Sequence, residues 1–500
     1  MTKILIGVHS FIWGVPALLL VLGVGLYLSI LTDFAQLKLF PRALRAFCAM
    51  FRGRKNGDGV SPFRALCTAL AATVGTGNLI GVAGAICLGG PGSVFWMWLC
   101  AILGMMTKFA EVTLAVRYRT AENGEYVGGP MYMILNGMGK NRRMLAGCYC
   151  FFGVVAAFGV GNATQINAVV AGLNGILEPL GIIPDRRRDL AFGLILAVLV
   201  GTMLFGGARR IGAVAERLVP AASAIYIILC AGVLICRAEA VPGAFRDILR
   251  GAFSPRAVTG GIVGSGFQAL KTGCSRGVFT NEAGMGTASI AHASAKTPHP
   301  AEQGLLGIME VFLDTIVICT LTALVILSSG VPIPYGQDAG GTLTSEAFAW
   351  VCGDGVRVFL ACAMCCFAFA TVLGWGLYGA RCAQFLFGNT AWETFALLQT
   401  ATVVLGAVLN TQTVWLLAES VNGLMAIPNL IALAYLSPEL VRLTVEYKEK
   451  SGKNIASGGN HANFHQCKPL RTISHAEIPS LCRSGGKSGK EDLSSEHRSA

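Results

Sequence analysis

Charged residues are scarce in this chain. Asp, Glu, Lys and Arg together make up 13% of its 500 residues, while hydrophobic residues make up 54%. Soluble domains carry about 25% charged residues, so the charge available here is too little to cover a soluble surface. This shortage excludes an ordinary cytosolic enzyme, a disordered chain and a small disulfide-rich secreted domain. It predicts an all-α polytopic membrane protein with the lipid bilayer as its surroundings.

The basic residues do not form a nucleic-acid-binding face. The formal net charge is +12, but Lys and Arg stand in short clusters between apolar runs, as in the cytoplasmic loops of membrane proteins. One cluster extends from Arg42 to Arg64 and another from Arg117 to Arg143. We therefore expect no nucleic-acid partner, and nothing points to an obligate protein partner.

Motifs of enzymes and metal sites are also missing. The 17 cysteines lie mostly in apolar runs, and the pair Cys362 and Cys365 has no second pair at zinc spacing. The segment from Gly273 to Gly277 fits G-x-S-x-G, but it lies at the end of an apolar span and not in the strand-to-helix turn of a hydrolase. No Walker loop and no H-E-x-x-H motif occur. The sequence predicts neither an enzyme nor a bound cofactor.

Apolar runs long enough to cross a bilayer, which takes about 20 helical residues, occur eleven times. They lie near 11–32, 62–88, 92–116, 145–171, 189–206, 213–236, 257–274, 303–329, 356–387, 392–409 and 413–436. The basic loops at 33–61 and 117–144 are expected in the cytoplasm and the acidic loop at 330–356 outside. This predicts an outer N-terminus and a cytoplasmic C-terminus, although basic connections at 186–188 and 237–256 run against it.

Glycine clusters interrupt two of these runs, near 73–78 and near 264–274. Glycine weakens a helix by about 1 kcal/mol relative to alanine, and an opened backbone in lipid needs partners from protein, water or a ligand. Close helix packing through small residues is the alternative explanation. Thr76 and Asn78, which stand among the glycines of the first cluster, favour a functional break.

The positions of the two breaks indicate a repeat. Without the first run, the remaining ten divide into five and five, and a broken helix opens each half. Inverted repeats with discontinuous helices are typical of secondary transporters. We expect an extra helix and basic loop at 1–61, a first repeat at 62–236, a second, inverted repeat at 237–440 and a polar, disordered cytoplasmic tail at 441–500.

A break of this kind exposes two kinds of backbone group. N–H groups at the start of the second half attract a carboxylate, and carbonyls at the end of the first half can hold Na⁺. One break can therefore bind both an amino acid and a cation.

Longer motifs resemble the alanine/glycine:cation symporter family (sodium:alanine symporters). They are Thr73–Asn78 followed by Gly89–Trp98, Gly128–Tyr132, Leu270–Gly284 and Asn422–Asn429. The resemblance implies about eleven transmembrane helices, a LeuT-type 5+5 core with one extra N-terminal helix, and a location in the cell membrane. It also implies symport of alanine or glycine with Na⁺, the ion being co-transported and not a cofactor.

The resemblance also suggests roles for individual residues. Thr76, Gly77 and Asn78 would bind the substrate carboxylate, and the carbonyls of Ala72, Thr73 and Gly75 would bind sodium. Core helix eight would lie against this break, with the Thr371 hydroxyl as a further sodium ligand, unless that hydroxyl only bonds its own helix.

Four more side chains are candidates for the pocket. Trp375 and Phe267 could close it around a small side chain or could simply pack. Asn162 and Gln165 put two amides three positions apart in one span, which suggests either substrate contacts or bonds between helices.

Acidic residues in the spans support a competing hypothesis of proton coupling. They are Glu282, Glu310, Asp314 and Glu419, while Lys108 and Glu111 have the spacing of an ion pair within a helix. An amino-acid channel or a sensor that does not transport would share the same core.

Overall fold

The computed structural model describes residues 15–51, 60–122, 124–177, 181–254, 259–261, 265–337, 340–409 and 411–456. Gly264 of the expected second break and the histidine-containing tail beyond residue 456 lie outside these residues. So do residues 11–14 of the first expected span. The described part is helical except for one two-stranded hairpin.

Helices cover the first half of the chain in its described parts, and the hairpin lies between the third and fourth expected spans. The elements are α2 (Val15–Leu31), α3 (Ala35–Lys38), α4 (Phe40–Met50), α5 (Pro62–Thr73), η1 (Gly77–Gly81), α6 (Val82–Gly89), α7 (Gly92–Arg117), β1 (Thr120–Glu122), β2 (Glu125–Val127), α8 (Pro130–Met133), η2 (Ile134–Met138), η3 (Lys140–Arg142), α9 (Arg143–Phe158), η4 (Gly159–Ala163), α10 (Thr164–Leu177), α11 (Arg186–Leu204) and α12 (Gly207–Cys236).

The second half is also helical where it is described. Its elements are α13 (Val241–Phe253), α14 (Gly266–Asn281), α15 (Thr287–Ala293), α16 (Pro300–Val311), η7 (Phe312–Cys319), α17 (Thr320–Ser329), α18 (Gly340–Cys352), α19 (Val356–Phe387), α20 (Ala391–Val408), α21 (Thr411–Tyr435) and α22 (Ser437–Ala456). The cysteines that the structure describes are free thiols.

Length and apolar composition identify the membrane-crossing helices. Six helices in the described residues are long and apolar enough to span a bilayer, and up to eight if two bent pairs each count as one span. One of these pairs is α5 with the helix Gly77–Gly89, bent by 52°. The protein is therefore a multi-pass membrane protein.

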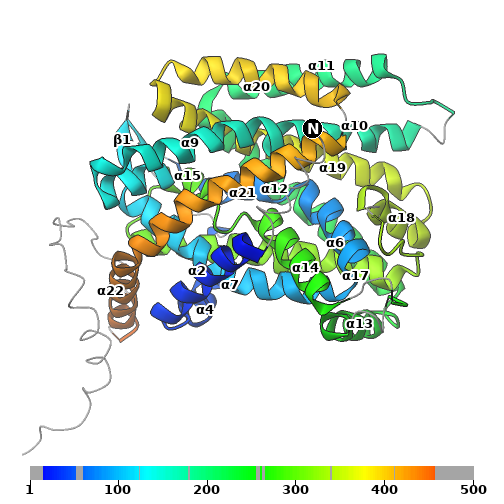
Figure 1. Ribbon diagram of the computed structural model, residues 1–500, viewed down its shortest axis with the longest axis horizontal. Helices are drawn as coiled ribbons and strands as arrows, with labels where there is room; N and C mark the ends of the chain where they lie inside the picture. The colour runs from blue at the N-terminus through cyan, green and yellow to red at the C-terminus, as the bar shows by residue number, and fades with distance from the viewer. Residues whose placement is uncertain are drawn as a thin grey trace, which may run out of the picture. The chain divides into compact units, whose positions relative to one another are not determined.

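Helices α7 and α19 each pack against several other helices. Helix α7 lies against α14 and α16, and α19 lies against α5, α9 and α12. Helices α11 and α20 run side by side along one edge, at the top of Figure 1. This arrangement places α5, α14 and α19 around one central volume.

The second break is not where the glycines of 264–274 predicted it. Helix α14 continues without interruption from Gly266 to Asn281, so residues 266–274 are helical and the G-x-S-x-G segment has no strand beside it. The chain leaves the helix at Glu282, which has φ 52°, and turns through Gly284 and Gly286, which have φ values of 95° and 77°. We call residues 282–286 the second break, and residues 74–76 the first break.

The end of the described chain also differs from the expectation. Disorder was expected from residue 441, but α22 covers Ser437–Ala456. Its first half is anchored, since Leu440, Leu443 and Thr444 are buried. The apolar side of this helix was hidden in the sequence by the charges on its opposite side.

Packing at the second break can be tested with a pair of glycine variants. Gly286 and Gly207 have similar left-handed φ values of 77° and 73°, but a Cβ on Gly286 would lie 2.3 Å from Cγ of Pro130, and one on Gly207 would meet nothing within 4 Å. We expect Gly286→Ala to cost about 1–3 kcal/mol more stability than Gly207→Ala, because it adds overpacking to the same backbone strain. Thermal unfolding of both purified variants in one detergent measures the difference. Equal melting temperatures would contradict the close packing of α15 on α8.

Candidate substrate and ion site

The first break is held open by a side chain. Helix α5 ends at Thr73, and Val74 is extended, with φ −80° and ψ 99°. The Gly75 N–H then donates to Oδ1 of Asn78 (2.9 Å), so it does not continue the α5 ladder. The side-chain amide of Asn78 donates in turn to Oδ1 of Asp314 (2.6 Å).

Helix α19 lies directly against the first break, as the family resemblance implied. A Cβ on Gly75 would lie 2.7 Å from Oγ1 of Thr371, and one on Gly374 would lie 3.0 Å from the backbone of Ala72. The Thr371 hydroxyl donates its proton to the Phe367 carbonyl (3.0 Å). Because that proton is directed away, lone pairs of the hydroxyl oxygen remain for a cation.

A small cavity lies between the two breaks and α19. It is lined by Ala72, Thr73, Gly75, Thr76, Gly77, Val160, Gln165, Phe279, Thr280, Glu282, Thr371 and Trp375. Residues from four segments far apart in the sequence therefore meet at one place.

Most residues selected from the sequence reach this cavity, and three do not. Asn78 braces the break instead of lining the cavity. Phe267 is 56% exposed, near the start of α14, because the second break lies beyond the far end of that helix. The aromatic ring that lines the cavity from α14 is Phe279.

The third residue that does not line the cavity is Asn162, which is fully buried and donates to the Gln399 carbonyl on α20 (2.7 Å). Gln165 does line it and accepts a hydrogen bond from Thr76 (3.0 Å). The two amides separate because Gly159–Ala163 forms the π-helical segment η4, which changes the register of the side chains along the span.

Trp375 forms a fixed wall of the cavity. A Cβ on Gly161 would lie 2.2 Å from Cβ of Trp375, so only glycine leaves room for this side chain. The indole N–H donates to Oε1 of Glu282 (2.9 Å). Trp375 thus links α19 to the second break across the cavity.

Sequence reasoning missed Val160, Phe279, Thr280 and Glu282 as lining residues. The signal for two of them, Thr280 and Glu282, was the segment Thr280-Asn281-Glu282-Ala283-Gly284-Met285-Gly286, with two glycines two positions apart after a polar run. The denser glycine cluster at 260–266 drew the prediction away from it.

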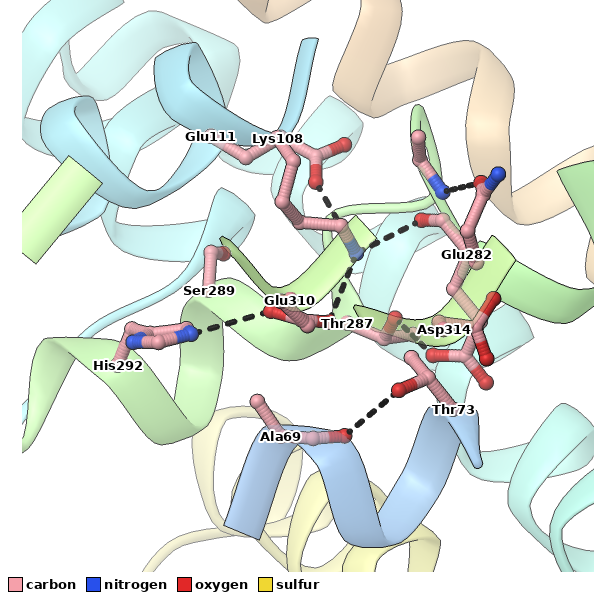
Figure 2. Close-up of polar contacts among 12 residues, drawn as sticks. Ala69, Thr73, Lys108, Glu111, Glu282, Thr287, Ser289, His292, Glu310 and Asp314 are labelled. Atoms are coloured by element: carbon pink, nitrogen blue, oxygen red, sulfur yellow. Dashed lines mark hydrogen bonds and ion pairs between the residues drawn. The ribbon is translucent and has the colours of Figure 1, made fainter. Parts of the chain in front are cut away.

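A buried network of charged residues supports the second break (Figure 2). Lys108 and Glu111 on α7 form the expected pair at 3.8 Å, and Lys108 also pairs with Glu310 on α16 at 3.4 Å. Glu310 contacts Nε2 of His292 on α15 (3.1 Å). All four side chains are fully buried, so the network works as internal scaffolding for the polar backbone of the break.

Comparison with known proteins identifies the family of the chain. The model of the sodium:alanine symporter family matches residues 1–460. The sodium/alanine symporter AgcS of Methanococcus maripaludis is 38% identical over 447 residues, which cover 88% of this chain and 96% of that protein. An uncharacterized transporter of Haemophilus influenzae is 42% identical over 453 residues, covering 90% and 96% of the two chains.

A solved structure shows the same kind of fold. MhsT in complex with L-phenylalanine matches with a TM-score of 0.53 at 15% identity, covering 79% of this chain and 99% of that one. At this identity the match bears on the fold alone. Taken with the family match over most of its length, the chain belongs to the sodium:alanine symporter family and is a multi-pass membrane protein for sodium-coupled amino-acid symport.

Proposed function

We propose that the protein couples the entry of Na⁺ to the uptake of a small neutral amino acid, alanine or glycine, at the cavity between the two breaks. The observation that carries this proposal is a small cavity walled by an interrupted helix, a threonine hydroxyl and a tryptophan whose indole is hydrogen-bonded to the second break. A relative named as a sodium/alanine symporter supports the choice of substrate. The close contact of Trp375 with Gly161 holds this wall of the cavity in place.

The substrate carboxylate is proposed to bind at the first break. Thr76 and Gly77 stand where the second half of the helix begins, and N–H groups at a helix start attract anions. Asn78 contributes indirectly, because its side chain is already bonded to Gly75 and Asp314. Gln165 holds the Thr76 hydroxyl at the rim of the same cavity.

Sodium is proposed to bind between α5 and α19. The carbonyls of Ala72 and Thr73 belong to the end of α5, and the last carbonyls of a helix have no partner within it. The carbonyl of Gly75 lies in the first break, where it also accepts a bond from the Asn78 N–H (3.3 Å). The Thr371 oxygen lies against Gly75. Carbonyl and hydroxyl oxygens together form the hard ligand set that an alkali cation requires.

Transport would follow from alternating access of two inverted five-helix halves around this fixed site. The orientation proposed from the loop charges places the C-terminus in the cytoplasm. Glu125 of the hairpin pairs with Arg209 and Arg381, so the segments that carry these three residues lie on one side. The hairpin strand β1 and the helix α18 lie at opposite ends of the molecule (Figure 1). This is the separation required of a cytoplasmic and an outer segment.

Proton coupling is the weaker candidate. Glu310 is held by Lys108 and His292, and Asp314 by Asn78 and Thr315, so both carboxylates already have structural partners. The side chain of Glu419 lies outside the described residues. Accumulation of substrate against its gradient distinguishes a symporter from a channel or a sensor. A channel cannot concentrate its substrate, and a sensor does not transport it.

Uptake into proteoliposomes tests the proposal. With an inward sodium gradient, we expect radiolabelled alanine and glycine to accumulate above equilibrium, because the ion gradient does the work. A potassium gradient or a pH gradient alone serves as the control and should give no accumulation. Accumulation that persists without sodium would rule out sodium coupling.

The sodium site is tested by a matched pair of threonine variants. Thr371 and Thr402 make the same bond to the carbonyl four residues earlier, but only Thr371 lines the cavity, and Thr402 is exposed on α20. We expect Thr371→Val to raise the sodium concentration for half-maximal uptake by at least about tenfold, if one lost ligand costs more than ~1.4 kcal/mol. Thr402→Val should leave it unchanged. Similar sodium curves for the two variants would remove Thr371 from the site.

A further inference from the structure

Glu282 is a buried carboxylate residue in the wall of the cavity. It is 3% exposed, and it is the first residue of the second break. Its φ of 52° places the backbone in the left-handed region, which residues other than glycine rarely adopt. Such a conformation persists where the surrounding structure holds it, and it is common at functional sites.

The hydrogen bonds that the structure shows to this carboxylate come from neutral donors. Trp375 donates to Oε1 at 2.9 Å and Thr287 donates to Oε2 at 2.6 Å. Each carboxylate oxygen has a second acceptor position. Each oxygen therefore retains an acceptor position beyond the bond that the structure shows.

The nearby Lys108 forms its ion pairs with carboxylates other than Glu282. Lys108 pairs with Glu310 at 3.4 Å and Glu111 at 3.8 Å, and its hydrogen bond to Glu282 goes to the backbone carbonyl (3.2 Å), as Figure 2 shows. Asp314 adds another buried carboxylate to the network. One positive charge thus lies among several buried carboxylates, so their negative charge is compensated only in part. A buried charge without compensation is costly. A cation in the cavity would offset this cost at Glu282.

The two breaks present opposite groups to the cavity. At the second break, Oε1 of Glu111 accepts from the N–H groups of Gly284 (2.8 Å) and Gly286 (3.0 Å). These N–H groups are occupied by the protein itself and are not available to a substrate carboxylate. The cavity is left with acceptors there, namely Glu282 and the carbonyl end of α14, which carries the negative end of the helix dipole.

We propose that the carboxylate of Glu282 binds the ammonium group of the transported amino acid, while the substrate carboxylate faces the first break. This inference rests on the proposed function and adds to it the group that selects amino acids. An ammonium ion and a carboxylate form a charge-assisted hydrogen bond, which is about twice as strong as a neutral one. A small carboxylic acid without an amino group would bring a second anion beside Glu282 and be repelled.

The test compares two ligands that differ only in the amino group. Radiolabelled alanine is bound to the purified full-length protein in nanodiscs at saturating sodium, and it is displaced by unlabelled alanine or by propionate. The measured quantity is the ratio of the propionate to the alanine concentration that displaces half of the label. We expect Glu282→Gln to reduce this ratio by at least about tenfold, because alanine loses a charged partner and propionate loses a repulsion.

Glu216→Gln is the control, because it removes a carboxylate on α12 that pairs with Arg64, belongs to another part of the protein and does not line the cavity. Its ratio should equal that of the unsubstituted protein. If the role of Glu282 were purely structural, the substitution would weaken the binding of both ligands equally and leave the ratio unchanged. That result would overturn the inference. A rise in the sodium requirement at an unchanged ratio would also overturn it, since Glu282 would then be an ion ligand.

If Glu282→Gln does not fold, Glu282→Asp takes its place. It keeps the charge but withdraws the carboxylate by one methylene, so alanine should bind at least about threefold more weakly while propionate remains excluded. Unchanged alanine binding would contradict the inference. If the unsubstituted protein binds no alanine in sodium, the proposed function and this inference both fail. If it binds alanine normally and the variant shows an unchanged ratio, the inference alone fails.

Discussion

A backbone opened inside a bilayer must find hydrogen-bond partners within the protein, and this requirement organises the site. At the first break the partner is the amide of Asn78, which accepts from Gly75. At the second break it is the carboxylate of Glu111, which accepts from Gly284 and Gly286. Without these acceptors, the N–H groups would be left unsatisfied at a cost of several kcal/mol each in hydrocarbon.

The charges buried beside the second break follow from the same requirement. A carboxylate is a strong acceptor for two N–H groups, but its own charge then needs compensation. Lys108 supplies it from one helical turn away, and Glu310 and His292 extend the network to α16 and α15. The few charges that this protein keeps inside its spans are therefore concentrated where the helix is interrupted. If α15 moved, the hydrogen bond between Gly286, directly before it, and Glu111 on α7 would either move with it or break.

The sequence located the first break because Thr76 and Asn78 stand among its glycines, and polar residues there have no packing role. It misplaced the second break because the glycine cluster at 260–266 is denser than the pair Gly284 and Gly286 that marks the true position. Where α14 ends depends on Glu111, which is 173 positions earlier in the chain, and no local pattern reports such a contact. The position of Phe267 was wrong for the same reason. Thr371 was selected through the family resemblance and Trp375 as an aromatic that could close the pocket, and both line the cavity.

Three π-helical segments contribute residues to the site or its supports: η1 holds Asn78, η4 holds Gly161 and Asn162, and η7 holds Asp314. Each is wider than an α-helical turn, and such segments are frequent at functional sites. A substitution within one of them alters a single contact. Loss or gain of one residue would instead rotate the rest of the span by about 100°, given 3.6 residues per turn. The length of these segments, as much as the identity of their residues, thus determines which side chains face the substrate.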